Sequence, residues 1–121
     1  MLLGDFYSIE SSNRIGQKVI CMIRINVAHT FFSCHFPDAP VVPGTCILQI
    51  LKELLEIMFR IKLCYGRIIQ CKFMNPIDPR QSESIYFEIT VRKEDEIKVW
   101  ADACIKSDIC SFSQIKSVFL K

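Results

Sequence analysis

Apolar and polar residues alternate along most of the chain, with a period of about two that predicts β-strands. The clearest run extends from Lys18 to Ile25, and β-branched or aromatic residues also dominate the segments around it. After Gly66 the alternation returns, and turn-like stretches separate the successive runs. The predicted strands are residues 5–10, 17–27, 67–74, 83–93, 96–106 and 111–120.

One segment between these strands has the period of a helix instead. It extends from Thr45, a suitable N-cap, to about Lys62, and Glu56 and Arg60 form a favourable i,i+4 pair within it. Its apolar residues cover well over half of the circumference, so we expect the helix to be nearly enclosed. These residues are Ile47, Leu48, Ile50, Leu51, Leu54, Leu55, Ile57, Met58 and Phe59. Such a helix, about 25 Å long, buries its apolar surface only against a sheet that curls round it, which predicts an α+β fold.

Length and composition fit one globular domain, residues 1–121, with 50% hydrophobic residues and 23% charged residues. Fifteen Lys and Arg against thirteen Asp and Glu leave a net charge of +2, which gives no reason to expect a nucleic-acid partner. The N-terminus lacks the pattern of a signal peptide, and charged residues interrupt the longest apolar stretch. We therefore expect no membrane span.

The chain contains seven cysteines, an odd number, and no two of them have the C-x-x-C spacing of a zinc or redox site. Most lie among apolar residues, where a free cysteine behaves as a small hydrophobic residue. We expect buried free thiols in a reducing cytoplasm, rather than a metal cluster. The cysteines are Cys21, Cys34, Cys46, Cys64, Cys71, Cys104 and Cys110.

Residues 28–44 carry three prolines and end in Gly44, which predicts an ordered loop before the helix. The sequence of residues 31–49 is Phe-Phe-Ser-Cys-His-Phe-Pro-Asp-Ala-Pro-Val-Val-Pro-Gly-Thr-Cys-Ile-Leu-Gln. It resembles the active-site segment of the 3-hydroxyacyl-(acyl carrier protein) dehydratases, hot-dog fold enzymes of fatty-acid synthesis. The residues that match the family's pattern in spacing are Phe31, Phe32, Cys34, His35, Phe36, Pro40, Pro43 and Gly44. The run from Cys71 to Ile77 resembles the family's next strand.

The resemblance implies one long central helix wrapped by a curved antiparallel sheet, and a dehydratase that needs no cofactor or metal. His35 would be the main acid/base, since an imidazole titrates near neutral pH. Gly44, with Cys34 beside His35, would bind the thioester oxygen, because helix N-termini offer free N–H groups and a positive dipole end. The acyl chain would lie in an apolar tunnel, although ordinary core packing is the alternative for its residues. The tunnel residues are Phe31, Phe32, Phe36, Ile47 and Phe73.

The sequence departs from the family at Gln49, where the family has Asp or Glu. An amide orients a hydroxyl or a water but does not donate or accept a proton at neutral pH. Glu53 lies one helical turn further on, and it would substitute only through a water or a bent pocket. Alternatively, Gln49 begins a solvated polar stripe that continues through Glu53, Glu56 and Arg60.

The leading hypothesis is therefore a dehydratase acting on 3-hydroxyacyl groups, in fatty-acid or related lipid and polyene synthesis. A thioesterase, or a catalytically impaired subunit that pairs with an active dehydratase, are the alternatives. The expected partner is an acyl carrier protein with a phosphopantetheine-linked acyl chain, and its acidic surface would meet basic residues. The candidates are Lys52, Arg60, Lys62, Arg67 and Lys72. The resemblance also implies a homodimer or a trimer of dimers, whereas His29 is expected to be a loop or surface residue.

Overall fold

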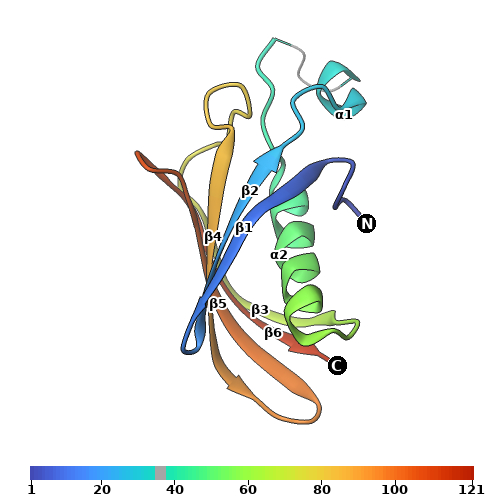
Figure 1. The fold of residues 1–121 in the computed structure, drawn as a ribbon, viewed down its shortest axis with the longest axis vertical. Helices are drawn as coiled ribbons and strands as arrows, with labels where there is room; N and C mark the ends of the chain where they lie inside the picture. Colours follow the sequence, from blue (N-terminus) through green and yellow to red (C-terminus); the bar gives the residue numbers. More distant parts are fainter. Residues whose placement is uncertain (35–37) are drawn as a thin grey trace.

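A computed structural model describes residues 1–34 and 38–121 of the chain. It contains one six-stranded sheet, a short helix α1 and a longer helix α2 (Figure 1). In chain order the elements are β1 (Tyr7–Ile15), β2 (Lys18–Ile25), α1 (Thr30–Cys34), α2 (Gly44–Phe59), β3 (Cys64–Phe73), β4 (Ser84–Glu94), β5 (Lys98–Lys106) and β6 (Ser111–Leu120).

The strand order of the sheet determines where α2 lies. The order is β1-β2-β4-β5-β6-β3, and all neighbouring strands are antiparallel. The chain therefore leaves the sheet after β2, near one edge, and returns as β3 at the opposite edge. The segment between them must cross a face of the sheet, and Figure 1 shows α2 running along the face towards which the sheet bends.

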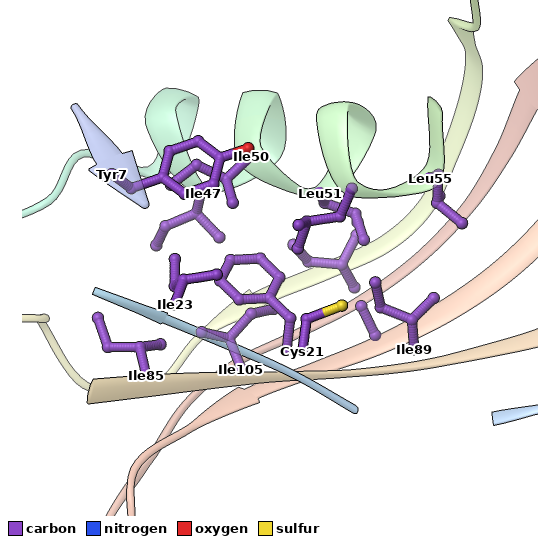
Figure 2. Close-up of a cluster of buried hydrophobic side chains, with 14 of the residues drawn as sticks. Tyr7, Cys21, Ile23, Ile47, Ile50, Leu51, Leu55, Ile85, Ile89 and Ile105 are labelled. Atoms are coloured by element: carbon purple, nitrogen blue, oxygen red, sulfur yellow. The ribbon is translucent and has the colours of Figure 1, made fainter. Parts of the chain in front are cut away.

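The core lies between α2 and this face of the sheet. Alternate residues of the inner strands point towards the helix, for example Ile23 and Phe87, which are 0% and 1% exposed. From α2, Ile50, Leu51 and Leu55 fill the space above them (Figure 2). The alternation predicted from the sequence for β2, β4, β5 and β6 is thus the pattern that places one side of each strand in the core.

The N-terminal strand is longer than predicted, because β1 continues to Ile15 rather than ending at residue 10. It is an edge strand whose residues are mostly exposed, and its register with β2 shifts between Ile9 and Ser11. Polar residues are tolerated on such an edge, so the apolar periodicity that identifies the inner strands is absent.

Helix α2 differs from the prediction at both ends. It begins at Gly44 with Pro43 as its N-cap, so the prediction of Thr45 as the cap is wrong. It ends at Phe59, and Arg60 has the left-handed conformation at φ 55°. Glu56 accepts a hydrogen bond from Leu63 N at 2.9 Å, where the prediction had paired it with Arg60.

The helix is less enclosed than predicted. Six of its residues are buried, whereas Ile57 is 45% exposed and Leu48, Met58 and Phe59 are only partly buried. One side of α2 is therefore open in a single chain.

Among the helices of the described residues, none is both long enough and apolar enough to cross a membrane.

Two further predictions need correction. The segment before α2 contains the five-residue helix α1, where a loop was predicted throughout. The cysteines are free thiols, but only Cys21 is buried, whereas Cys34, Cys64 and Cys104 are exposed. Apolar sequence neighbours do not bury a thiol that lies on the outer side of a strand, because alternate residues of a strand face opposite sides.

Candidate functional site

The start of α2 presents unpaired backbone donors. Cys46 N and Ile47 N both donate to the Pro43 carbonyl, at 3.0 and 3.1 Å. The N–H groups of Gly44 and Thr45 precede these first bonds, so they have no partner within the helix. The helix dipole adds a partial positive charge here, and the end of α2 therefore favours an oxygen that becomes negatively charged.

A groove of about 320 Å³ lies beside this helix end. We call it the Gly44 groove; it is lined by Val41, Val42, Pro43, Gly44, Ile47, Phe73, Met74, Asn75, Pro76 and Ile77. It brings together three of the predicted residues, namely Gly44, Ile47 and Phe73. The lining is mainly apolar, as a binding site for a hydrocarbon chain requires.

Phe73 lies directly over Gly44. A Cβ atom added at Gly44 would be 2.7 Å from the Cζ atom of Phe73, closer than real side chains approach. Only glycine therefore fits beneath the ring in its present position. Phe73 is 53% exposed, so its ring is partly free of other packing and covers the groove next to the helix end.

Phe31 and Phe32 do not line this groove. Both rings pack on Phe6, with ring centroids 6.0 and 5.3 Å from it, and the His29 ring also lies against Phe6 at 5.4 Å. The two phenylalanines hold α1 on the N-terminal segment, which agrees with the core-packing alternative for them.

The principal predicted acid/base is not placed by the structure. His35 and Phe36 lie outside the described residues. Cys34, the last residue of α1, is exposed.

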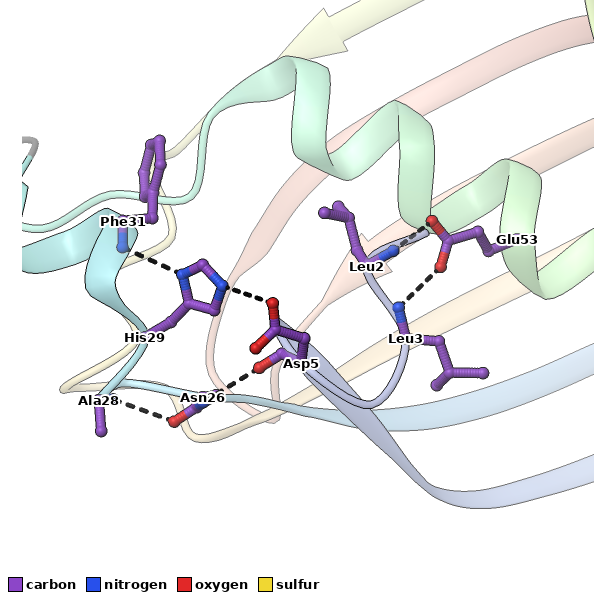
Figure 3. A network of polar contacts seen from close by, with 8 residues as sticks. All are labelled: Leu2, Leu3, Asp5, Asn26, Ala28, His29, Phe31 and Glu53. Carbon is purple, nitrogen blue, oxygen red and sulfur yellow. Dashed lines mark hydrogen bonds and ion pairs between the residues drawn. The ribbon is translucent and has the colours of Figure 1, made fainter.

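Glu53 is the centre of a buried polar network, of which Figure 3 shows the bonds from Leu2 N and Leu3 N. It is 1% exposed, and its carboxylate accepts four hydrogen bonds. Leu2 N and Leu3 N donate at 2.9 Å each, the Tyr7 hydroxyl at 3.1 Å, and Gln49 Nε2 at 2.8 Å. Burial acts to raise the pKa of the Glu53 carboxyl, but these hydrogen bonds outweigh it and hold the pKa below its usual value.

The network determines the chemistry of its members. Glu53 is ionised at neutral pH and both of its oxygens accept hydrogen bonds. It therefore does not replace the acidic residue that the family has at the position of Gln49. Burial, followed by the charge of Glu53, raises the pKa of Tyr7, so the phenol stays protonated and donates. Glu53 lies one helical turn after Gln49 in the sequence. Three of its four hydrogen-bond donors, however, come from the N-terminal segment, residues 1–7, and no sequence motif predicts this contact.

Gln49 faces a second groove, on the open side of α2. This Gln49 groove has a volume of about 600 Å³ and is lined by Met1, Gln49, Lys52, Glu53, Glu56, Ile57, Arg60, Ile61 and Lys62. Gln49 and Gly44 are five residues apart, which on a helix separates them by roughly 140° and about 7.5 Å. Within one chain the two predicted site residues thus face different grooves.

His29 was predicted to be a loop or surface residue, and its side chain is held by two hydrogen bonds. Its Nδ1 accepts from Phe31 N at 3.0 Å, so Nε2 carries the proton and donates to Asp5 at 3.0 Å (Figure 3). Asn26 also donates to the Asp5 carbonyl at 3.0 Å. These bonds tie α1 to the same N-terminal segment that Glu53 ties to α2.

No metal centre is formed by the residues that the structure describes. They contain no group of three or more His, Cys, Asp or Glu side chains close enough to bind a metal ion.

Comparison with known proteins gives a match to one family over most of the chain. A family model described as ApeI-like, the ApeI dehydratase, matches residues 11–113. A 3-hydroxyacyl-[acyl-carrier-protein] dehydratase of Levilactobacillus brevis is 29% identical over 106 residues, covering 78% of this chain and 72% of the relative. The corresponding dehydratase of Chlamydia trachomatis is 25% identical over 124 residues, covering 95% and 78%.

Solved structures show the same fold. The dehydratase heterocomplex ApeI:P from Xenorhabdus doucetiae has a TM-score of 0.72 at 16% identity, covering 93% of this chain and 96% of that one. Thioesterase superfamily member 2 from Mus musculus has a TM-score of 0.65 at 12% identity, covering 95% and 81%. The fold, an antiparallel sheet with a helix on one face, is thus the hot-dog fold, which serves both kinds of protein.

Replacing Gln49 by Glu should destabilise the protein in a pH-dependent way. The new carboxylate would lie where an amide now donates to Glu53 at 2.8 Å, and two close carboxylates raise the pKa of one of them. When folding raises the pKa of a carboxyl, the free energy of unfolding of the protein falls as pH rises. The loss of stability relative to wild type should therefore be small below about pH 4 and grow towards neutral pH. Its final size should be about 1.4 kcal/mol for each unit of the pKa shift.

Urea unfolding between acidic and neutral pH measures this deficit. Gln81→Glu, at an exposed turn residue, is the matched control. A Gln49→Glu deficit that is absent, or equal at all pH values, would show that the Gln49–Glu53 contact does not exist in solution.

Proposed function

The chain belongs to the ApeI-like dehydratase family, and from this membership we propose that it removes water from 3-hydroxyacyl thioesters of an acyl carrier protein. The product is the trans-2-enoyl thioester, in fatty-acid or related lipid synthesis. The observation that carries the proposal is the family match over residues 11–113, because it includes both the His35 loop and α2. The dehydratases of L. brevis and C. trachomatis, named for this reaction, support it.

The reaction divides into three tasks. His35 removes a proton from C2, the electron pair forms the C2–C3 double bond, and the C3–O bond breaks. The leaving hydroxyl takes up a proton from the His35 imidazolium and departs as water, so one base serves both transfers. Backbone N–H donors at the start of α2, that of Gly44 foremost, stabilise the charge that develops on the thioester oxygen.

Gln49 orients the hydroxyl or the departing water, since its amide has no proton to transfer at neutral pH. The Gly44 groove holds the apolar part of the acyl chain, with Ile47 in its wall and Phe73 above the helix end. This arrangement assigns proton transfer to His35 alone.

The active unit in this proposal is a homodimer that pairs through β3. The other edge strand, β1, is polar and irregular, as edges protected from pairing are. Strand β3 instead exposes Ile68 and Ile69, at 42% and 46%, and Phe73 and Met74 follow at 53% and 43%. An apolar strand edge of this kind is suited to continuing the sheet into a second copy.

The two grooves support the same assembly. Gly44 and Gln49 face different sides of α2, so a complete site requires Gln49 of one copy to meet the loop of the other. The second copy would also cover part of the open side of α2 and leave the basic residues of the Gln49 groove exposed, so that α2 would be more enclosed, as its apolar sequence predicts.

A basic surface for the acidic carrier protein accompanies the Gln49 groove. Three of the predicted candidates, Lys52, Arg60 and Lys62, line it together. Arg67 and Lys72 are exposed on β3. The carrier would dock where its phosphopantetheine arm reaches the groove.

The proposed activity is tested with a short 3-hydroxyacyl chain on acyl carrier protein, followed by mass spectrometry. The wild-type protein should form the enoyl thioester, and His35→Ala should lower the rate by about 10²–10⁴-fold. Release of free acid and free carrier would instead identify a thioesterase. An inactive wild type would indicate a subunit that pairs with an active dehydratase; the X. doucetiae protein is described as a dehydratase heterocomplex.

Charge reversal at Lys62 should weaken carrier docking. Lys62→Glu should raise the KM for the carrier-bound substrate several-fold at low salt, with a smaller effect as salt screens the charges. The KM for the same chain on free pantetheine should not change. Lys116→Glu, on the exposed part of β6, is the control. Equal effects on carrier-bound and pantetheine-bound substrates would refute docking at this surface.

Ile68→Lys should convert the dimer to a monomer and abolish dehydration, because the charge would be buried at the paired strand edge. Ile109→Lys, in a turn where the side chain is 95% exposed, should remain dimeric and active. Sedimentation velocity gives the oligomeric state of each variant. A monomeric wild type, or an active Ile68→Lys monomer, would contradict the shared site.

A further inference from the structure

We infer that Glu53 is a positioning residue for the reaction: it holds the Gln49 side chain so that the amide oxygen, Oε1, accepts a hydrogen bond in the active site. The inference rests on the proposed function, which assigns Gln49 to the hydroxyl or water. It adds a residue that acts through Gln49 and does not touch the substrate.

The carboxylate of Glu53 is held from several directions. Its Oε2 atom accepts from Leu2 N and Gln49 Nε2, and its Oε1 atom accepts from Leu3 N and the Tyr7 hydroxyl. Three of the donors come from residues 2–7 at the N-terminus, with Tyr7 as the first residue of β1, and the fourth comes from α2. Rotation of the carboxylate would break several of these bonds in a site that is 1% exposed, where an unpaired charge is costly.

A fixed carboxylate also fixes the orientation of the amide next to it. An amide has two donor hydrogens at one end and an acceptor oxygen at the other. An ionised carboxylate only accepts, so the Gln49 Nε2 end must face Glu53, and flipping the amide would bring two oxygens together. The Oε1 end is thereby left to accept from a hydroxyl or a water at the Gln49 groove.

This arrangement explains how an amide is useful at this position. A freely rotating glutamine would present its donor end as readily as its acceptor end, and would hold a substrate hydroxyl in two orientations. With the Nε2 end bound, Gln49 accepts the hydrogen of the 3-hydroxyl group, which leaves a lone pair of that oxygen free to take up the proton during departure. Lys52 and Glu56 line the same groove, but among the described residues the Gln49 amide bonds to Glu53.

The test compares two substitutions that remove different contacts of Glu53. Glu53→Gln keeps the size of the side chain but allows it to donate to Gln49 Oε1, which turns the amide round. We expect kcat for enoyl formation to fall about tenfold or more, since misplacing a reacting group by about 1 Å costs as much as 10²-fold, while KM stays within about twofold. Tyr7→Phe removes a bond to Oε1 of Glu53 and leaves the Gln49 bond intact. It should lower the melting temperature but leave kcat unchanged.

A direct readout of the contact does not depend on activity. In the wild-type protein the Gln49 side-chain amide hydrogens should exchange with solvent more slowly than those of exposed Gln81, as seen by ¹⁵N NMR, and Glu53→Gln should shift the Gln49 signal. The inference is overturned if Gln49 exchanges as fast as Gln81, or if Tyr7→Phe lowers kcat as much as Glu53→Gln does. A wild type that protects Gln49 but forms no enoyl product would refute the proposed function alone.

Discussion

The crossing of α2 over the sheet is the constraint on which the rest of the structure depends. Strands β2 and β3 lie far apart in the sheet, in the order β1-β2-β4-β5-β6-β3, so the chain between them has to traverse a face. Helix α2 makes this crossing and buries Ile50, Leu51 and Leu54 against the strands. The same crossing places Gly44 beside the end of β3, where Phe73 covers it, and leaves Gln49 on the open side of the helix. The separation of these two residues therefore follows from the topology.

The polar network around Glu53 completes what apolar packing leaves undetermined. Hydrophobic contacts hold α2 on the sheet but are non-directional, and they fix no single polar orientation on its open side. Four hydrogen bonds to one buried carboxylate do so, because each requires a particular direction. The N-terminal segment supplies three of the donors, and through Asp5 and Phe6 it also contacts His29 and α1. One short segment thus connects the helix that precedes the His35 loop with the helix that carries Gln49.

The periodicity of apolar residues predicted those elements that have one face in the core and the other towards solvent. Strands β2, β4, β5 and β6 have one face in the core, so their alternation was visible in the sequence. Strand β1 lies at an edge and needs no apolar face beyond its first residues, which is why its length was underestimated. The N-cap was misplaced because Pro43 fixes the start of α2 without a side-chain bond, whereas the residue with the side-chain chemistry of a cap, Thr45, lies two residues later.

The candidate site was predictable only in part, for a physical reason. Gly44, Ile47 and Phe73 were predicted as site residues from the resemblance to a family, and the structure brings these three residues into one groove. The position of Gln49 was visible in the sequence, but its link to Glu53 was not, because the other donors to Glu53 include backbone N–H groups of Leu2 and Leu3. Backbone donors leave no mark on residue identity. Burial of the cysteines failed as a prediction for the related reason that neighbours in sequence differ in the side they face.

In the proposed reaction the C3–O bond of an acyl chain forms and breaks while the thioester stays intact. Incubation of a 3-hydroxyacyl carrier thioester in water enriched in oxygen-18 tests this directly, because reversible dehydration exchanges the C3 hydroxyl with solvent. Dehydration should place one oxygen-18 atom on the acyl chain while it is still attached to the carrier. Oxygen-18 found only in a released carboxylic acid, or in no product at all, would contradict it.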